Sequence, residues 1–517
     1  MTRRRAIDPD ALTMEAIRGG LLDGASVTVL GFARSGVALA RFLADVGARV
    51  TVYDGRPADE LGGSIDALEG RSVTLALGPD VDPAATWADA VLVTTSPSIN
   101  PDYPTTEPRL RSALHALVDA RAGGDETAPA LISEPDLFLR LSVAPTIGVT
   151  GTKGKTTTSA LTAAILAADP AHPAVLGGNI GVPIVERLDE LTPDHRVVYE
   201  LSELQLPTLS RGTTVAVYTN VTSDHLDRHG SLEAYRRVKR RLAELVDPDG
   251  ALVLNAEDPI VASYAGLRSA PAVLYRRDAP LAGGLGVVDG WIVAARVPRL
   301  GIAGSDVTVT SADGRIMPID ELGIPGQHNV SNALAAIAVG LLFGVDPAAI
   351  RSAAAAFTGV EHRLEPVALV EGVRFVNDSQ GTQPDAVIAA LRAFDPPVVL
   401  IAGGRDKGVD LRELVRVAAK RAVAAVVIGE SGPELGRRLA AAGVAIVQPA
   451  ASMVEAVERA DTLARAARAT TDPGTVATVL LSPAAASFDM FTDYAARGQA
   501  FKDAVATLIR VRAEATR

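Results

Sequence analysis

The feature that most constrains the fold is an alternation of short β-branched runs with Ala- and Leu-rich helical patterns along almost the whole chain. Such an alternation is typical of βαβ units and parallel sheets, so we predict an α/β fold. At 517 residues the chain is long enough for roughly three domains. The polar stretch DARAGGDETAPA suggests the first domain limit, and we place the domains at 1–130, 131–358 and 359–517.

Local patterns predict individual strands and turns. In the first block, a strand at Val27–Leu30 leads through a glycine turn and a helix to a second strand that ends at Tyr53, with Asp54 beyond it. In the central block, Asp-Gly lies between strand-like runs in GVVDGWIV and in TSADGRIMPI, which predicts an antiparallel appendage. The third block has four β-branched runs that predict strands at 373–376, 398–402, 425–428 and 475–481.

Composition excludes several classes of protein. The formal net charge of −11 argues against nucleic acid or an anionic membrane as the main partner. No stretch reaches the roughly 18 apolar residues of a membrane helix, and the N-terminus lacks the apolar run of a secretory signal. The absence of cysteine excludes disulfides, Cys-ligated zinc and thiol catalysis. We therefore expect a cytoplasmic protein without membrane insertion, and we favour a monomer.

The stretch GVTGTKGKTTTSAL, from Gly148 to Leu161, has the composition of a phosphate-binding loop with an unusual spacing. The common loop has four residues between its glycines, whereas five separate Gly148 from Gly154. A strand, a glycine turn and a helix that begins near Thr156 would place free N–H groups around a phosphate. Lys155 would reach the terminal phosphates, and the Thr156 hydroxyl could ligate Mg²⁺. From this stretch alone, the alternative is an ordinary strand–helix turn with a surface lysine.

Polar residues follow the next two predicted strands. Glu200 directly follows the strand-like run 196–199. An Asp-His loop that contains His225 follows the run 214–219. In open α/β sheets ligands bind beyond the carboxyl ends of the strands, so these groups should converge with the phosphate loop. A hard cation prefers oxygen ligands, which Glu200 and Thr156 would supply. Each residue alone has an ordinary structural explanation, but three such features at three successive strand ends indicate a nucleotide site.

The helix after the Asp-His loop contains one more candidate. Ser231 is a suitable N-cap for LEAYRRVKRRLAEL, in which Leu232, Tyr235, Leu242 and Leu245 form an inward stripe. Lys239 lies one turn after Tyr235. On this pattern alone, a lysine at such a position is usually a solvated helix charge.

The first block has part of a dinucleotide-binding fingerprint. Gly31, Gly36 and Asp54 have the expected positions, but Ala33 occupies the second glycine position of G-x-G-x-x-G. The fingerprint is therefore broken, and it gives little support to NAD as a ligand.

Eight motifs resemble those of the Mur ligases, in the same order along the chain. They are GVTGTKGKTTT, ELSELQL, SDHLDRHGS with the Tyr and Lys that follow it, GQHNVSNALAA, EHRLE, VNDSQGTQPDA, AGGRDKG and LLSPAAASFDMF. The resemblance extends from Val27 to the final helix, and the loop form G-T-K-G-K-T is that of the Mur and folylpolyglutamate ligases. It implies a Rossmann-like N-terminal domain, a P-loop-type central ATPase domain with a mostly parallel sheet, and a Rossmann-like C-terminal domain.

The resemblance is closest to the Mur ligases that add D-glutamate to UDP-N-acetylmuramoyl-L-alanine in peptidoglycan precursor synthesis. It implies an ATP-dependent amide ligase. The carboxylate of the UDP-sugar would attack the γ-phosphate, giving an acyl phosphate and ADP, and the amine of D-glutamate would then displace phosphate. Lys155 and Mg²⁺, with two ions expected, would neutralise charge on the transferring phosphoryl group.

The matching motifs imply which residues form the nucleotide and metal sites. The ATP-binding residues would be Gly154, Lys155, Thr156, Thr157, Asn332, Arg363 and Asp378. The residues associated with the metal would be Thr156, Glu200, His225 and Lys239. Lys239 matches a lysine that is carbamylated in this family, where the carbamate lies near the second Mg²⁺. Lys155, His225 and Lys239 would be the catalytic residues.

The remaining motifs would bind the two other substrates. The UDP-sugar would contact Arg34, Ser35, Asp54, Ser96 and Asn179, and D-glutamate would contact Thr382, Lys407, Ser487 and Tyr494. The loop NDSQGTQ departs from the family pattern, because Gln380 replaces a lysine, and this leaves the amino-acid selectivity open. We also expect the third domain to close over the phosphate loop, since Lys155 and Lys407 come from different domains.

Three alternatives stay open at this point. Another Mur-type ligase or a folylpolyglutamate-type ligase would share the nucleotide chemistry, although the latter would not need a UDP-type N-terminal domain. A non-catalytic nucleotide-binding relative is disfavoured because the residues assigned to catalysis and metal binding are all present. A P-loop kinase is disfavoured by the glycine spacing. His328 and His362 also lie in the matched motifs, and we predict that both are local structural hydrogen-bonding residues.

Overall fold

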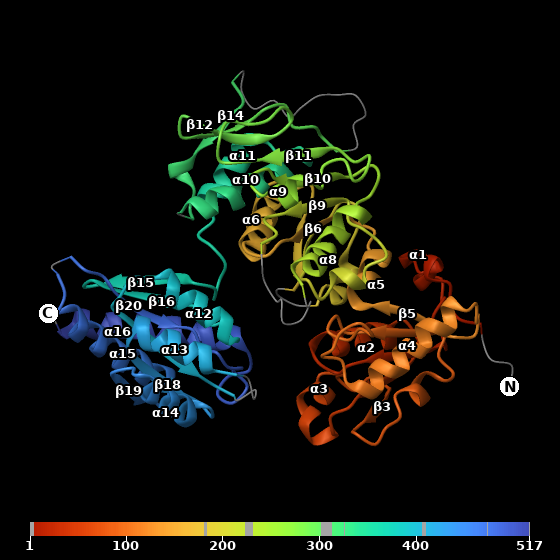
Figure 1. Cartoon of the computed structure of the whole chain (residues 1–517), viewed down its shortest axis with the longest axis horizontal. Coiled ribbons are helices and arrows are strands. Elements are labelled where there is room, and N and C mark those ends of the chain that lie inside the picture. Colours follow the sequence, from red (N-terminus) through yellow and green to blue (C-terminus); the bar gives the residue numbers. More distant parts are fainter. Residues whose placement is uncertain are drawn as a thin grey trace. The chain divides into compact units, whose positions relative to one another are not determined.

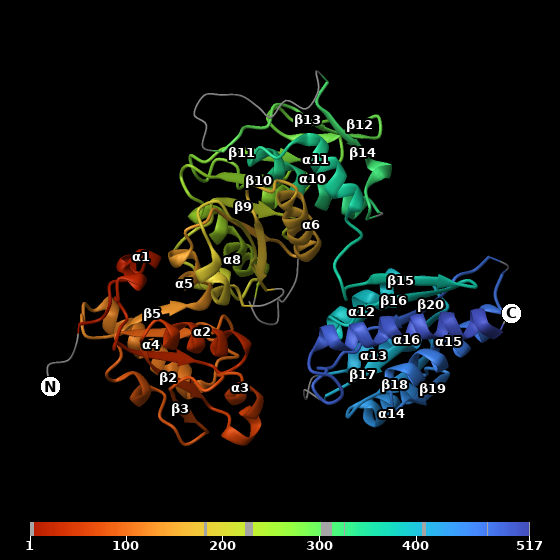
Figure 2. The same ribbon diagram turned by 180° about the vertical axis from the view of Figure 1, so that it is seen from behind.

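The computed structural model describes residues 5–179, 183–222, 231–300, 313–324, 326–405, 410–472 and 474–515. It consists of two compact units, Met1–Thr358 and Gly359–Arg517. The first unit contains a five-stranded and a nine-stranded sheet, and the second contains a six-stranded sheet (Figures 1 and 2). Most strand pairs are parallel, so the predicted α/β fold is confirmed. Among the described residues, no helix combines the length and the apolar character needed to cross a membrane.

The five-stranded sheet has the order β3-β2-β1-β4-β5, and all its pairs are parallel. Its order reverses next to β1, which makes the carboxyl ends of β1 and β4 a topological switch point. The predicted first strand is confirmed, and Asp54 is the last residue of β2 rather than the residue after it. The proposed domain limit at residue 130 falls at the start of β5. The strands are β1 (Ser26–Leu30), β2 (Arg49–Asp54), β3 (Val73–Leu77), β4 (Leu92–Thr95) and β5 (Ala130–Ser133).

Helices surround this first sheet. The helix α2 follows β1 and packs on β1 and β2, and α4 precedes β5. The helices and 3₁₀ turns of this part are η1 (Pro9–Ala11), α1 (Met14–Arg18), α2 (Arg34–Asp45), η2 (Ala58–Leu61), α3 (Gly62–Asp66), η3 (Ala84–Trp87), α4 (Pro108–Ala122) and α5 (Glu134–Leu141).

The nine-stranded sheet has the order β14-β13-β12-β11-β10-β9-β6-β8-β7 and is parallel from β7 to β12. The strands β12, β13 and β14 are antiparallel, which confirms the predicted appendage. The run before the second Asp-Gly lies in residues 301–312, outside the described residues. Asp289 and Gly290 both have positive φ in the turn between β12 and β13, as an Asp-Gly hairpin turn requires. The strands are β6 (Thr146–Thr150), β7 (Ala174–Gly178), β8 (Arg196–Glu200), β9 (Val215–Tyr218), β10 (Ala251–Asn255), β11 (Ala272–Tyr275), β12 (Leu285–Val288), β13 (Trp291–Ala294) and β14 (Arg315–Pro318).

Helices of this central part pack on its sheet and on one another. The helix α10 contacts α6, and both bury apolar side chains in one core with residues of β6, β9 and β10. The helices and 3₁₀ turns are α6 (Lys155–Ala167), η4 (Ile184–Glu190), η5 (Leu206–Thr208), α8 (Leu232–Leu245), α9 (Pro259–Ala262), η6 (Ile319–Glu321), α10 (Gln327–Leu342) and α11 (Pro347–Ala356).

The six-stranded sheet of the second unit has the order β15-β16-β20-β17-β18-β19. Only β15 and β16 are antiparallel. The four predicted strands are confirmed as β16, β17, β18 and β20, although β20 begins two residues later than predicted. The elements are β15 (Glu365–Val370), β16 (Val373–Asn377), α12 (Pro384–Ala393), β17 (Val398–Gly403), α13 (Arg412–Arg421), β18 (Ala422–Ile428), α14 (Gly432–Ala442), β19 (Ile446–Pro449), α15 (Met453–Arg468), β20 (Ala477–Leu481) and α16 (Tyr494–Ala515).

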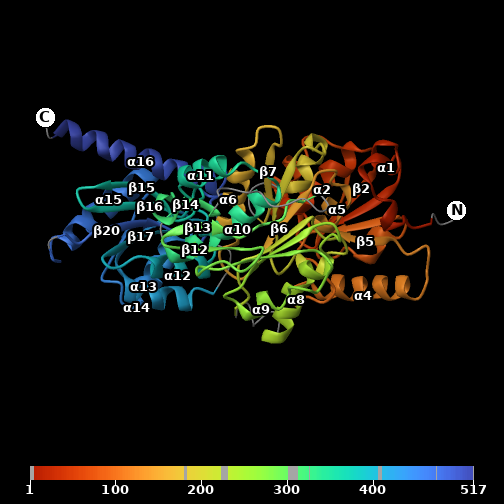
Figure 3. The ribbon, with the colours of Figure 1, turned by 90° about the horizontal axis from the view of Figure 1, so that it is seen from above.

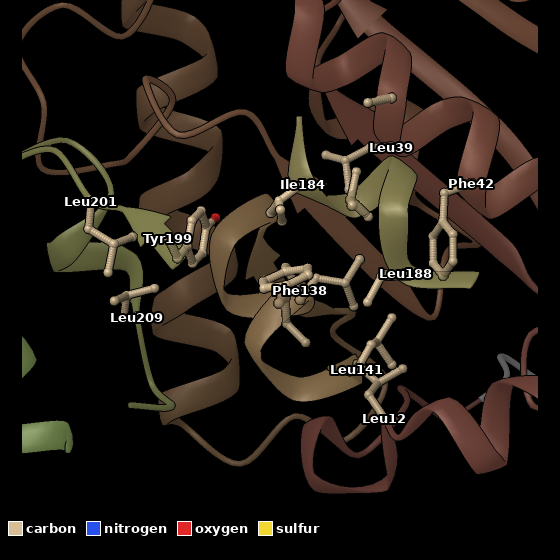
Figure 4. Packing of buried hydrophobic residues seen from close by; sticks show 14 of the residues in the cluster. Leu12, Leu39, Phe42, Phe138, Leu141, Ile184, Leu188, Tyr199, Leu201 and Leu209 are labelled. Carbon is tan, nitrogen blue, oxygen red and sulfur yellow. The ribbon is translucent and has the colours of Figure 1, made fainter. Parts of the chain in front are cut away.

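The first two sheets share one hydrophobic core. Leu39 and Phe42 of α2, Phe138 of α5 and Leu188 of η4 belong to the same buried cluster (Figure 4). The ring of Phe138 also packs edge-to-face on that of Tyr199 in β8, with 5.2 Å between the centroids. The elements α2, α5 and β6 lie in neighbouring parts of the first unit (Figure 3). The N-terminal sheet is therefore fixed to the central sheet by buried apolar side chains of α2, α5 and η4.

Candidate active site

The phosphate loop connects β6 to α6, as the sequence predicts. The helix begins at Lys155, and its N-cap Gly154 has a φ of +84° and no side-chain cap. A side chain at Gly151 is excluded, because a Cβ there would lie 1.9 Å from Thr219 Oγ1. The uncapped helix end leaves N–H groups of the first turn, which includes Thr156 and Thr157, available to an anion.

The loop is held by the residues that follow β9. The backbone N–H groups of Thr152 and Lys153 donate to the backbone oxygen and Oδ1 of Asn220 at 2.8 and 2.9 Å. Thr219 Oγ1 donates to the Lys153 oxygen at 2.6 Å, and the hydroxyls of Thr152 and Tyr235 are 2.9 Å apart. The residues that follow β9, together with Tyr235 of α8, therefore fix the conformation of the loop before any ligand binds.

Lys155 lies over the loop that it belongs to. Its Nζ donates to the backbone oxygens of Gly151 and Thr152, both at 3.1 Å. The predicted partner Asn332 of α10 lies against the other side of the loop, where Thr158 Oγ1 donates to its Oδ1 at 3.2 Å. The structure thus brings Lys155, Asn332 and the start of α6 together, as the motifs predict.

Glu200 ends β8, next to the strand that leads into the phosphate loop. In the sheet register it pairs with Val149 of β6, and its side chain is only 1% exposed. Oε1 accepts from Asn179 Nδ2 at 2.9 Å, whereas Oε2 is buried and has no hydrogen-bond partner among the described residues. A buried carboxylate oxygen without a partner is costly unless a cation compensates its charge. Glu200, with the buried hydroxyl residue Thr156 in the first turn of α6, therefore fits a Mg²⁺ site.

The described residues supply only part of the predicted metal site. His225 lies in the segment 223–230, outside the described residues. Elsewhere in the described chain, no group of three or more His, Asp or Glu side chains could hold a metal ion by itself. Among the described residues, the predicted oxygen ligands are thus one carboxylate and one hydroxyl, which suits a cation that is also held by substrate phosphates.

Lys239 is completely buried on the inner face of α8. Its Nζ lies 3.4 Å from Thr150 Oγ1, at the end of β6, and 5.5 Å from the centroid of the Tyr235 ring. The helix is fixed at this turn, because Tyr218 OH donates to the backbone oxygen of Lys239 at 2.7 Å. The helical pattern alone suggests a solvated lysine, and the structure shows that this interpretation is wrong. Ser231 is the N-cap of α8, as predicted.

A cavity of about 640 Å³ opens beside the phosphate loop. Its lining includes Gly154 of the loop, His328 and Asn332 of α10, and, at and after the end of β10, Asn255 and Asp258. The sequence motifs include neither Asn255 nor Asp258. Their position at and just after the end of an apolar strand-like run is the signal that could have identified them. His328, predicted to be structural, is part of this cavity wall.

The N-terminal candidate site lies at the switch point of the first sheet. Asp54 Oδ2 accepts from the backbone N–H of Phe32 and from Arg56 Nη2, both at 2.8 Å. Burial opposes ionisation of Asp54, but the hydrogen bonds from the Arg56 side chain and from backbone N–H groups outweigh it, and the net pKa is lowered. Asp54 is therefore an anion that fixes the turn after β1. Arg56 was not among the predicted residues.

The other predicted residues of this site surround the same turn. Arg34 and Ser35 occupy the first turn of α2, whose N-cap Ala33 has no side-chain cap. Ser96 follows β4, and its buried Oγ has no hydrogen-bond partner among the described residues. Asn179 lies apart from them, beside Glu200 in the central sheet.

In the second unit, the predicted residue Asp378 follows the carboxyl end of β16, and Arg363 precedes β15. Asp378 Oδ2 accepts from Ser482 Oγ at 2.6 Å, and Oδ1 accepts from the backbone N–H of Leu364 at 3.1 Å. Burial raises the pKa of Asp378 to about 6, against these hydrogen bonds and the nearby charge of Arg363. Arg363 itself is exposed.

Of the predicted amino-acid-binding residues, Thr382 follows β16, Ser487 follows β20 and Tyr494 begins α16. Ser487 is buried, Thr382 and Tyr494 are half-buried, and Lys407 is in the segment 406–409, outside the described residues. His362 is a structural hydrogen-bonding residue, as predicted, because its Nδ1 lies 2.9 Å from Asn377 Nδ2.

Two family models and curated relatives match this chain. The Mur ligase middle domain matches residues 149–340, and the Mur ligase glutamate ligase domain matches residues 362–485. The UDP-N-acetylmuramoylalanine–D-glutamate ligase of Pelotomaculum thermopropionicum is 38% identical over 93% of this chain and 97% of its own length. The chain belongs to the Mur ligase family.

Further comparisons give the same family. The ligase of the same name from Symbiobacterium thermophilum is 37% identical over 93% of this chain and 97% of its own length. A solved structure of UDP-N-acetylmuramoylalanyl-D-glutamyl-2,6-diaminopimelate–D-alanyl-D-alanyl ligase from Acinetobacter baumannii is 16% identical, with a TM-score of 0.47, over 89% of this chain and 90% of its own. This structural similarity is too low to add to the family assignment, which rests on the sequence matches.

Proposed function

We propose that this Mur ligase adds D-glutamate to UDP-N-acetylmuramoyl-L-alanine at the expense of ATP, in peptidoglycan precursor synthesis. The observation that carries the proposal is the uncapped phosphate loop beside a buried, unpartnered oxygen of Glu200. Relatives that carry this activity in their names match over nearly the full length of the chain. ATP and a UDP-linked precursor are intracellular substrates, which favours a cytoplasmic location.

In the first step, the carboxylate of the UDP-sugar attacks the γ-phosphorus of ATP. A new phosphorus–oxygen bond forms, the bond to the β–γ bridging oxygen breaks, and ADP leaves with that electron pair. Lys155 and the N–H groups at the start of α6 stabilise the charge on the phosphates. Thr156 and Glu200 would hold Mg²⁺, which supplies further charge neutralisation when bound.

In the second step, the amine of D-glutamate attacks the acyl phosphate carbonyl. The tetrahedral intermediate expels phosphate, an amide forms, and the amine gives up a proton. The predicted residues Thr382, Lys407, Ser487 and Tyr494 would bind the amino acid. Hydroxyl, ammonium and backbone N–H groups are suitable partners for its carboxylates.

The UDP-sugar would bind at the switch point of the first sheet. The first turn of α2, with Arg34 and Ser35, would face the diphosphate, and Ser96 has a buried hydroxyl without a partner there. Asn179, which already donates to Glu200, would connect the sugar site to the phosphate loop. His225 would lie close to the reacting carboxylate.

We further propose that Lys239 is carbamylated and that its carbamate helps to hold a second Mg²⁺. A neutral amine adds to CO₂, so that a nitrogen–carbon bond forms and one proton is released. The complete burial of Lys239 and the position of Nζ 3.4 Å from Thr150 Oγ1, at the end of the strand that leads into the phosphate loop, support this role. Protein equilibrated with ¹³C-bicarbonate should show a carbamate signal by NMR that Lys239→Ala lacks and the exposed Lys420→Ala keeps.

Activity gives a second test of the carbamate. Lys239→Ala should be severely impaired. Wild-type turnover of that variant, without any dependence on bicarbonate, would exclude the proposed role.

The proposed activity is tested by ADP release. Purified protein receives Mg-ATP and UDP-N-acetylmuramoyl-L-alanine, with D-glutamate or one of a panel of other amino acids. Turnover confined to D-glutamate is the expected result. Turnover with a different amino acid would keep the ligase chemistry and place its specificity in the loop around Gln380. No turnover with any acceptor would favour a non-catalytic nucleotide-binding relative.

A further inference from the structure

Arg497 is a buried cation at the meeting point of the strand-end loops of the second unit. It lies in the first turn of α16, is 1% exposed, and is the largest fully buried side chain of the described residues. Its Nε and Nη2 donate to Oγ and the backbone oxygen of Ser379, both at 3.0 Å. Nη1 donates to the backbone oxygen of Ala485 at 3.1 Å. The guanidinium thus joins the loop after β16 to the loop after β20.

A third loop approaches the same guanidinium. A Cβ at Gly404, directly after β17, would lie 3.2 Å from Arg497 Nη1. Backbone hydrogen bonds connect the three loops, from Ala484 to the Gly381 oxygen at 2.8 Å and from Arg405 to the Ala486 oxygen at 2.9 Å. Neighbouring parallel strands end here, which is where ligands bind in open α/β sheets.

The charge of Arg497 is not neutralised by a hydrogen-bonded carboxylate of the described chain. All three of its acceptors are neutral, namely one hydroxyl and two backbone oxygens. Asp489 is the acid that acts on it electrostatically, but this residue is exposed and its Oδ2 accepts from the backbone N–H of Glu430 at 2.8 Å. Burial lowers the pKa of Arg497 to about 10, opposed by Asp489, so the group is charged at neutral pH.

Burying a charge without an ionic partner disfavours folding, so a cation kept at this place points to a functional role. The loops that Arg497 holds contain the predicted amino-acid contacts Thr382 and Ser487. The residue between Ser379 and Gly381 is the uncharged Gln380. A cation behind these loops, shielded from water, raises the electrostatic potential at the site more than an exposed cation would. An amino acid with an additional carboxylate benefits from that potential, whereas its neutral amide analogue does not.

We propose that Arg497 is a positioning residue that makes this site selective for an amino acid with an acidic side chain. It acts by holding the loops after β16 and β20 and by its buried positive charge, and it does not contact the substrate. The inference rests on the proposed ligase function, and it adds the physical origin of the preference for a dicarboxylic amino acid.

The test compares Arg497→Gln, which removes the charge, with Arg497→Lys, which retains it. The main measurement is the ratio of kcat/KM for D-glutamate to that for D-glutamine. We expect this ratio to fall at least about tenfold in Arg497→Gln, mainly through the KM for D-glutamate, and to be largely retained in Arg497→Lys. The KM for ATP should change much less. Equal ratios in folded Arg497→Gln and in the wild type would overturn the proposal, and so would equal losses in the two variants.

A variant in the held loop covers the case in which Arg497→Gln does not fold. Gln380→Glu leaves Arg497 in place and adds an opposing charge at a half-buried position. It should also lower the D-glutamate to D-glutamine ratio, and an unchanged ratio would overturn the proposal. The amino acids that the wild-type protein accepts distinguish a failure of this inference from a failure of the proposed function. Use of a different dicarboxylic amino acid would contradict D-glutamate and support the role of Arg497, whereas use of neutral amino acids alone would contradict both.

Discussion

At the scale of single residues, Lys155 is the cation that the mechanism needs at the phosphate loop. Its Nζ is already held 3.1 Å from two loop oxygens, so it requires only a local rotation to reach a phosphate. We expect Lys155→Ala to lower ADP release by at least about a hundredfold, a typical loss for one group that stabilises transition-state charge. Lys153→Ala is the comparison, because Lys153 is exposed and holds Asn220 through backbone atoms. Comparable losses in both variants would argue against a specific role for Lys155.

Glu134 makes a separate prediction about stability and pH. It is 3% exposed at the start of α5, and burial raises its pKa to about 7, against the backbone N–H of Val185 and the charge of Arg34. The folded protein therefore binds this proton more tightly than the unfolded chain does. The stability of the wild type should fall as pH rises from about 4.5 to about 7, by up to ~3 kcal/mol.

The substitution Glu134→Gln removes this titration and keeps the shape of the side chain. Urea unfolding of both proteins at pH 5 and pH 8 measures the effect. We expect the variant to gain stability relative to the wild type on going from pH 5 to pH 8. A difference in free energy of unfolding that does not vary with pH would show that Glu134 is not protonated in the folded protein near neutral pH.

The residues that could be predicted from the sequence share one property, which is that a local pattern identifies them. Glu200 follows a β-branched run, and Lys155 follows a glycine turn. Arg497, Glu134 and Arg56 have no such pattern. Their importance comes from burial or from contact with segments that are distant in sequence, such as Arg497 with Ser379, and only the folded chain shows these relations.

At the scale of elements, α5 connects the two sheets of the first unit. Phe138 is completely buried in the core that α2, α5 and η4 share (Figure 4). Phe138→Ala should therefore reduce the free energy of unfolding by about 3–5 kcal/mol, with one cooperative transition for the whole unit. Val118→Ala on α4 is the control, because Val118 is 40% exposed and should cost less than about 0.5 kcal/mol. A second, separate transition in Phe138→Ala would show that the two sheets unfold independently.

The existence of the strands is easier to predict from the sequence than the residues at which strands and domains begin. The strands predicted around Val27, Val398 and Ala425 exist because buried parallel strands need continuous β-branched runs, which are visible in the sequence. The position of β5 was harder, because this short strand follows a polar stretch that resembles a linker. It joins the first sheet by pairing with β4, which is a non-local contact. The domain limit predicted at residue 130 therefore coincides with the first residue of β5.

At the scale of the whole molecule, the two compact units should fold independently. The hydrophobic clusters of residues 1–358 contain no residue of 359–517, and the reverse also holds for the described residues. Separate chains that end at Thr358 and begin at Gly359 should each show native-like circular dichroism and a cooperative thermal transition. Neither should release ADP with the full set of substrates, because Lys155 belongs to the first chain and Asp378 and Ser487 to the second. An unfolded second chain would show that its core depends on the first, and turnover by the first chain alone would exclude the second unit from the catalytic site.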